Sequence, residues 1–293
     1  MRFWSPCSRA ALVCSLLLGL QGPALADPAA LRERHEALRD ALRGSPFGRP
    51  LHLESRQMGE SLQGDVYAVL DHSFEKVRDA LAQPANWCDV MILPFNTKYC
   101  HAVQADGGPA LMVRIGRRYD QPVEHAFRLQ FDHRLVAASP RYFECRLSAQ
   151  EGPVGTRDYR IVVSAIPLDG GRTFLHLGYA YGFGTMGRIA MHAYLATAGA
   201  DKVGFTRVNN GAGGHGLIGG MRGAVERNAM RYYLAIDTFL DSLDAPPAQR
   251  AERRIQGWFD ATERYPLQLR EMDRRTYVSM KRMEVERQQT LLP

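Results

Sequence analysis

The chain has 293 residues, of which 45% are hydrophobic and 23% are charged, and its formal net charge is +6. These values are typical of a soluble globular protein, and they exclude a disordered chain, a collagen and a coiled-coil array. The 37 basic residues include only four lysines, and no block of five or more like charges occurs. We therefore expect no nucleic-acid partner, because such binding needs basic residues gathered on one face.

The first 26 residues have the features of an export signal. An uncharged apolar run, Ala10–Leu20, follows two arginines, and Ala24–Ala26 is an A-x-A cleavage site. The run is too short to cross a hydrocarbon core of roughly 30 Å. The sequence therefore predicts a signal peptide over residues 1–26 and an exported protein, periplasmic in a Gram-negative bacterium and secreted otherwise. An uncleaved anchor helix is the alternative.

Three cysteines follow this signal: Cys88, Cys100 and Cys145. An oxidising compartment permits disulfides, and three cysteines allow one pair and leave one thiol over. We predict a disulfide between Cys88 and Cys100, the closer pair, with Cys145 buried on a strand. A bond between Cys100 and Cys145 is the alternative. No CxxC pair occurs, so we expect no structural zinc.

The segment after the signal predicts a helix, a strand pair and two short helices. Residues 27–49 form an N-terminal helix and linker, because Asp27 can cap a helix and Pro28 suits its first position. We then expect paired strands at 51–58 and 63–72 and short helices at 74–81 and 86–93.

From there to residue 183 the sequence alternates between apolar and polar residues, as half-buried strands do. Val123, His125, Phe127, Leu129 and Phe131 share one face of such a segment. Glycine-containing turns separate the segments, which is typical of an antiparallel meander with one wet face. We expect its strands at about residues 98–103, 110–118, 123–132, 143–147, 159–165 and 175–183.

A long amphipathic helix is predicted from about Leu217 to Leu243, after a glycine-rich segment that holds a short strand at Lys202–Val208. Two prolines then break the chain. The extension over residues 246–293 is predicted to form two charged helices that meet at Tyr265–Pro266, as a solvated, mixed-charge appendage. Its apolar edge is expected to pack on its own domain, and a transient membrane or protein contact is the alternative; the edge comprises Leu269, Met272, Met280 and Met283.

This order of elements resembles the START-like (SRPBCC) helix-grip superfamily, which includes lipid-transfer START domains, polyketide cyclases and birch-pollen-allergen proteins. The local match is VYAVLDHSFEKVRDALAQPANWCDVM, in which a strand, a turn, a helix with spaced Val77 and Leu81, and then Trp87 follow one another. Ser73 stands where the family often has proline. The resemblance covers residues 50–245 and implies an α+β fold, with a curved antiparallel sheet wrapped around the long C-terminal helix.

The same resemblance implies an apolar cavity between sheet and helix. Aromatic rings and a few polar groups converging there would suit a hydrophobic small molecule or a lipid, without a cofactor or a metal. The primary hypothesis is therefore an exported binding or carrier protein. The candidate ligand-binding residues are His125, Phe127, Phe143, Tyr179, Tyr181, Arg222, Asn228 and Tyr232.

Two other functions stay open. A cyclase- or hydratase-type enzyme would use the same cavity, with His125 as the general base and Tyr179 or Tyr181 as its proton partner. A structural or interaction module would use the extension to dock a partner. Two G-x-G-x-x-G sequences, at 182–187 and 214–219, lack the parallel sheet and the acidic residue of a dinucleotide fold, so we interpret them as loops near the cavity mouth.

Overall fold

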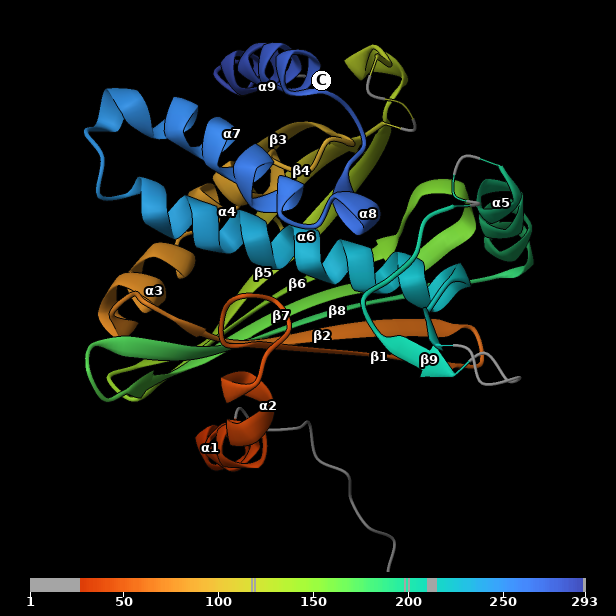
Figure 1. Cartoon of the computed structure of the whole chain (residues 1–293). Helices are drawn as coiled ribbons and strands as arrows, with labels where there is room; N and C mark the ends of the chain where they lie inside the picture. Colours follow the sequence, from red (N-terminus) through yellow and green to blue (C-terminus); the bar gives the residue numbers. More distant parts are fainter. Residues whose placement is uncertain are drawn as a thin grey trace, which may run out of the picture.

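The computed structural model describes residues 27–116, 118, 120–197, 199, 201–209 and 215–291, so the predicted signal peptide lies outside the described residues. Eight strands form one sheet in the order β1-β2-β8-β7-β6-β5-β4-β3 (Figure 1). The strands are β1 (Leu51–Met58), β2 (Ser61–Leu70), β3 (Thr97–Ala105), β4 (Gly108–Ile115), β5 (Phe127–Ser139), β6 (Tyr142–Glu151), β7 (Thr156–Leu168) and β8 (Arg172–Phe183), with a separate ribbon of β9 (Arg207–Asn209) and β10 (His215–Leu217).

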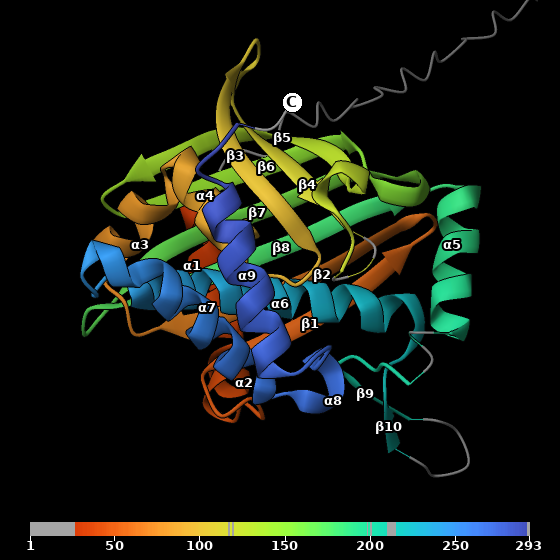
Figure 2. The same ribbon diagram turned by 90° about the horizontal axis from the view of Figure 1, so that it is seen from above.

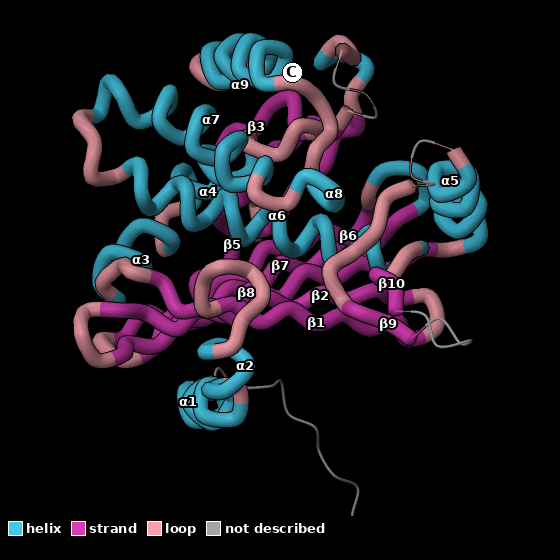
Figure 3. Tube along the Cα trace, viewed as in Figure 1, coloured by secondary structure: helices cyan, strands magenta, loops and turns pink. Residues whose placement is uncertain are grey.

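Helices lie on both faces of this sheet, with α1 and α2 on one side and α6 on the other (Figure 3). They are α1 (Pro28–Ala37), α2 (Arg39–Arg43), α3 (Phe74–Leu81), α4 (Pro84–Met91), α5 (Thr185–Ala196), α6 (Gly220–Ser242), α7 (Pro247–Glu263), α8 (Pro266–Leu269) and α9 (Arg274–Arg287). None of those within the described ranges combines the length and the apolar character that crossing a bilayer requires.

All neighbouring strands of the large sheet are antiparallel, as the hairpin turns predict. β3 to β8 pair in chain order, and β2 pairs with β8, which brings the N-terminal hairpin beside the last strand of the meander. The tight turn between β7 and β8 contains Gly170 and Gly171, both with positive φ, a conformation that glycine adopts without a Cβ clash. The sheet is curved: in the view of Figure 1, β1 and β2 lie below α6, and β3 and β4 lie above it.

The predicted long helix is α6, which lies across the inner face of the sheet (Figure 2). Val66 and Leu177 of the sheet and Val225 and Phe239 of the helix are fully buried between the two layers. A Cβ at Gly64 on β2 would lie 3.1 Å from the carbonyl oxygen of Val225, so this glycine lets helix and strand approach closely. The inner face of the sheet and α6 therefore enclose the main core.

The N-terminal helix lies against the opposite, outer face of the sheet (Figure 1). Asp27 caps α1 by accepting hydrogen bonds from the backbone of Ala29 and Ala30, as the sequence predicts. Leu31 and Leu38 are buried in a second, smaller apolar cluster with Phe174 of β8. The outer face is thus apolar under α1, and the sheet has core on both sides there.

The disulfide between Cys88 and Cys100 is confirmed, with a Cα–Cα distance of 5.1 Å. It ties α4 to β3. Cys145 is a free thiol, buried on β6 as predicted.

The C-terminal extension is not the solvated appendage that its charge suggests. Trp258, Tyr277 and Lys281 are each no more than 3% exposed. The Trp258 indole donates to the backbone carbonyl of Arg231, and the Tyr277 hydroxyl donates to that of Leu93. The apolar side of the extension therefore completes the core above α6 and α4, and some of its charged residues are buried with it: Arg254, Lys281 and Glu284.

The predicted apolar edge of the extension divides between core and surface. Leu269 and Met280 are buried and Met272 is half-buried, whereas the Met283 side chain is 57% exposed. This edge packs mainly on its own chain.

Two local expectations are wrong. Strand β5 begins at Phe127 rather than Val123, because residues 123–125 form a 3₁₀ turn after Pro122. The short strand expected at Lys202–Val208 is displaced to β9, Arg207–Asn209, where it pairs with β10.

Candidate ligand-binding site

Tyrosine rings gather between the inner face of the sheet and α6. The rings of Tyr159 on β7 and Tyr181 on β8 are stacked with centroids 5.4 Å apart. Tyr179 on β8 lies 5.3 Å from Tyr232 on α6, again between ring centroids. Phe131 of β5 meets Tyr159 edge-on at 6.2 Å. We call these five residues the aromatic cluster.

Two members of the cluster have the environment of a cavity wall. Burial raises the pKa of the Tyr159 and Tyr232 hydroxyls, so protein atoms surround both groups. Both side chains nevertheless keep accessible surface. Tyr159 lines a hollow of about 510 Å³, together with polar residues such as Glu60 and Arg157. Half-buried aromatic rings of this kind are the groups that small-molecule sites use for apolar contact.

A few polar groups accompany the rings. Burial raises the pKa of the Tyr179 hydroxyl well above its ordinary value, and the nearby Asn228 side chain acts in the opposite direction. Asn228 Oδ1 also accepts a hydrogen bond from Arg231 at 3.3 Å. The tyrosines are therefore neutral hydrogen-bonding groups at physiological pH, able to orient a polar atom of a ligand.

A hollow of about 640 Å³ opens between α5, the β1–β2 turn and the start of α6. Phe183, two residues after Tyr181 on β8, lines it with Met221 of α6 and Val203. Arg188 of α5 and Lys202 add positive charge to its rim, and His192 of α5 also lines it. This hollow is a candidate entrance to the space between sheet and helix.

Another hollow, of about 650 Å³, is formed by the loop between β4 and β5. Half-buried Phe127 and exposed His125 line it with Arg118, Asp120, Gln121 and Pro122. His125 therefore lies on an exposed 3₁₀ turn, and not on the inward face of a strand as the alternation suggests. A general base at this position faces solvent instead of the tyrosines.

Phe143 is separated from the aromatic cluster. It is fully buried, and on β6 it pairs with Ala165, which pairs with Leu175 on β8, four residues before Tyr179. The residue shares the inward face with the tyrosines but lies farther along the sheet, in the core. Alternation identifies the face of a strand but not the position along it.

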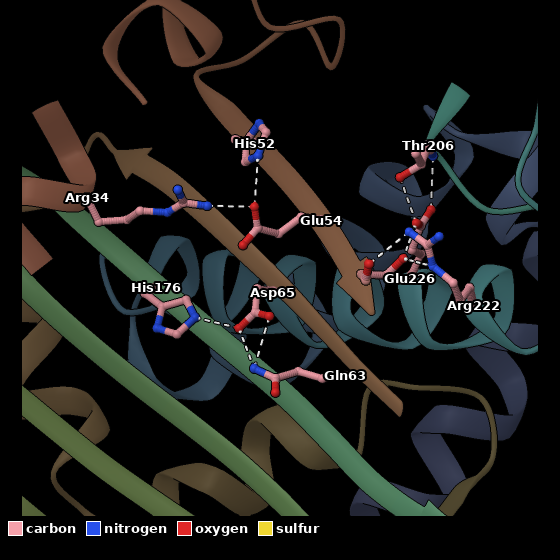
Figure 4. A network of polar contacts seen from close by, with 10 residues as sticks. Arg34, His52, Glu54, Gln63, Asp65, His176, Thr206, Arg222 and Glu226 are labelled. Carbon is pink, nitrogen blue, oxygen red and sulfur yellow. Dashed lines mark hydrogen bonds and ion pairs between the residues drawn. The ribbon is translucent and has the colours of Figure 1, made fainter. Parts of the chain in front are cut away.

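Arg222 and its neighbour Glu226 do not form the surface ion pair that their spacing suggests. Arg222 donates to the carbonyl oxygen of Ser55 at 2.8 Å and to its hydroxyl at 3.2 Å. Glu226 is fully buried, and its Oε1 accepts from the hydroxyls of Ser55 and Thr206. Figure 4 shows Arg222, Glu226 and Thr206 together at one end of α6. Their contacts fix α6 to β1 and to the segment before β9.

A second polar cluster lies on the outer face of the sheet (Figure 4). Asp65 of β2 is 2% exposed, and its Oδ1 lies 2.8 Å from His176 Nε2 on β8. Nearby, Arg34 of α1 donates to Glu54 of β1 at 2.6 Å. These contacts hold α1 and the sheet edge together, on the side away from the aromatic cluster.

The structure thus brings Tyr179, Tyr181, Tyr232 and Asn228 together and leaves His125, Phe143 and Arg222 elsewhere. Tyr159 joins the aromatic cluster although it is not among the candidate residues. Its signal is present in the sequence, because it shares the alternating face of β7 with Ile161 and Val163. The buried acceptor Glu226 has no such signal.

The first G-x-G-x-x-G sequence, at 182–187, connects β8 with α5. Gly187 lies against residue Gly155, where a Cβ would come within 2.9 Å of the backbone oxygen, so it serves close packing. The second sequence begins outside the described residues. Across the described part of the chain, no group of three or more His, Cys, Asp and Glu side chains could hold a metal ion.

No protein-family model and no curated protein sequence matches the chain. A solved structure of a norcoclaurine synthase mutant from Thalictrum flavum is similar, with 13% identity, a TM-score of 0.34 and coverage of 50% of this chain and 89% of the synthase. An aromatase/cyclase, Zhui, from a Streptomyces species has 15% identity, a TM-score of 0.31, and coverage of 48% and 74%. Ara h 8.0201 has 10% identity, a TM-score of 0.35, and coverage of 66% and 99%.

The fold can be assigned from the architecture itself. The N-terminal hairpin, β1 and β2, lies beside β8 in an antiparallel sheet whose edge strands are β1 and β3. The long helix α6 lies across the inner face of this sheet. The chain therefore has the helix-grip architecture that the sequence resemblance implies, in which a curved antiparallel sheet packs against a long helix near the C-terminal end.

Proposed function

We propose that this is an exported binding or carrier protein for a hydrophobic ligand, a lipid, held between the inner face of the sheet and α6. The observation that carries the proposal is the aromatic cluster, in which Tyr159 and Tyr232 are enclosed by protein and still accessible. Aromatic rings supply large apolar area, and their hydroxyls supply orientation.

Other observations support the same proposal. The hollow beside α5 is a candidate route from solvent to the rings. The Cys88–Cys100 disulfide suits an oxidising compartment, in agreement with export by the predicted signal peptide. The cyclase- or hydratase-type alternative needs His125 near a tyrosine or a carboxylate of the cavity, whereas His125 lies on an exposed 3₁₀ turn.

The first test identifies the ligand. The protein is produced with its natural N-terminus, purified, and extracted with organic solvent for mass spectrometry. We expect a co-purified lipid and a mature N-terminus at Asp27. An empty extract, together with no binding of fluorescent lipids, would overturn the proposal.

A pair of tyrosine variants tests the site. Tyr232→Ala removes a ring from the aromatic cluster, and we expect it to weaken fluorescent-lipid binding about tenfold, the effect of losing roughly 1–2 kcal/mol of contact. Tyr67→Ala is the matched control, because Tyr67 is also half-buried but lies on the outer face, stacked on His176. Equal loss of binding in both variants would contradict the assigned location.

A further inference from the structure

Arg227 of α6 is a buried cation that forms no ion pair with any residue that the structure describes. Its side chain is 2% exposed. One guanidinium nitrogen donates to the carbonyl oxygen of Val203 at 3.3 Å, and Nε has no hydrogen-bond partner among the described residues. By contrast, Arg231, one turn later, forms an ion pair with Glu271. A buried charge that lacks a counter-ion is strongly unfavourable, so its presence needs an explanation.

The adjacent carboxylate does not neutralise Arg227. Both oxygens of Glu226 are occupied: Oε1 accepts from Ser55 and Thr206, and Oε2 accepts from the backbone of Phe205 at 2.6 Å and of Thr206 at 3.0 Å. Successive helical residues point about 100° apart, so Glu226 contacts β1 and residues 205–206, whereas Arg227 reaches the same segment at the carbonyl oxygen of Val203.

The position of Arg227 links the two parts of the candidate site. Its hydrogen-bond partner Val203 lines the hollow beside α5, together with Lys202 and Met221. The charge of Arg227 also acts on Tyr181 of the aromatic cluster, where it opposes the rise in hydroxyl pKa that burial causes. Arg227 is therefore linked by a hydrogen bond to a residue of the hollow and by its charge to the aromatic cluster.

We propose that the ligand is an amphipathic acid, whose carboxylate or phosphate binds the Arg227 guanidinium while its apolar part lies among the tyrosines. This inference rests on the proposed function and specifies its ligand class. Guanidinium groups bind carboxylates and phosphates through paired, charge-assisted hydrogen bonds, and the bond to Val203 uses Nη1 of Arg227 but neither Nε nor Nη2. An anionic headgroup supplies the counter-ion that the described chain does not.

The test compares ligands that share one apolar chain. Purified protein, stripped of bound lipid, is titrated calorimetrically with dodecanoate, dodecyl phosphate and dodecanol. We expect at least one of the two acids to bind about tenfold more tightly than dodecanol, and the tighter acid distinguishes a fatty-acid carboxylate from a lipid phosphate. Arg227→Met should bind all three alike, at the affinity of dodecanol for the unmodified protein.

Two further variants exclude a general effect of charge or folding. Arg275→Met removes an exposed arginine of α9 and should keep the preference for acids. Arg227→Lys should keep part of it. In the absence of ligand, Arg227→Met should melt at or above the temperature of the unmodified protein, because it removes an unpaired buried charge; a lower melting temperature would indicate a structural role.

The outcomes separate this inference from the proposed function. If dodecanol binds as tightly as both acids, or if Arg227→Met keeps the preference, the anionic headgroup is wrong while a hydrophobic ligand stands. If none of the three binds and fluorescent lipids also fail, the proposed function itself is wrong.

Discussion

Single side chains determine the polarity of the space under α6. Tyr179 and Tyr232 present rings with neutral hydroxyls, and Arg227 adds a positive charge. Glu226, the preceding residue of the helix, is fully buried and accepts four hydrogen bonds, which hold α6 to β1 and to residues 205–206. One turn of α6 thus combines a residue that fixes the helix with the arginine that we propose as the partner of an anionic headgroup.

Glu226→Ala tests the structural half of this arrangement. The change leaves the donors of Ser55, Phe205 and Thr206 without their acceptor, so we expect the free energy of unfolding to fall by about 3 kcal/mol. Urea denaturation measures it. Glu286→Ala, an exposed glutamate of α9, is the control and should change stability by less than about 0.5 kcal/mol. Similar values for both variants would show that the Glu226 contacts contribute little.

At the scale of elements, α9 is held to the sheet by a buried charge cluster. Lys281 is fully buried and donates to the carbonyl oxygens of Pro94 and Thr97 and to Glu284. Glu284 also accepts from Lys98 of β3 at 3.0 Å. The cluster lies next to the strand that carries the Cys88–Cys100 disulfide, so covalent and ionic links fix the same region.

This cluster gives stability a dependence on pH. Burial lowers the pKa of Lys281 to about 8 from its ordinary 10.5, although Glu284 acts in the opposite direction. Between these two values the unfolded chain binds more protons than the folded chain, so the contribution of Lys281 to stability rises with pH. The difference in unfolding free energy between the unmodified protein and Lys281→Met should therefore grow by about 2 kcal/mol from pH 8 to pH 10.

Denaturation at a series of pH values measures this difference. Lys76→Met is the comparison, because Lys76 is paired with Asp244 at the surface rather than buried, and it should show no such rise. A flat difference for Lys281→Met across the same range would contradict the lowered pKa.

At the scale of the whole molecule, the C-terminal extension is part of the core. Ile255 and Trp258 of α7 and Tyr277 of α9 are buried in the same cluster as the inner face of the sheet. Arg254 of α7 also forms an ion pair with Asp89 of α4 at 2.9 Å. A domain that ended at residue 245 would expose the apolar surface that these side chains cover.

Deleting residues 246–293 should therefore abolish cooperative folding. Removing one buried Trp costs about 3–5 kcal/mol, and several such losses exceed the roughly 5–15 kcal/mol that stabilise a typical domain. We expect loss of the near-ultraviolet circular dichroism signal and increased binding of a hydrophobic dye. A truncated protein that unfolds cooperatively near the original midpoint would instead support a separate docking module.

The sequence by itself determined the secondary structure and the topology class. The alternation in β7 and β8, the turn at Gly170–Gly171 and the stripe of α6 are local signals, because strand and helix periods are set by the backbone. The disulfide was predictable for a similar reason: a short loop around a turn brings Cys88 and Cys100 together.

Only the tertiary structure decided which of these residues meet. Whether Phe143 lies with Tyr179 depends on the register across β6, β7 and β8, and whether the extension is solvated depends on the face of α6 that it covers. His125 lies on a 3₁₀ turn after Pro122 instead of on the expected strand. The burial of Arg227, which makes it a candidate ligand-binding residue, is visible only in the folded chain. Periodicity assigns a face to each residue, whereas register and long-range packing assign its neighbours, and the site consists of neighbours.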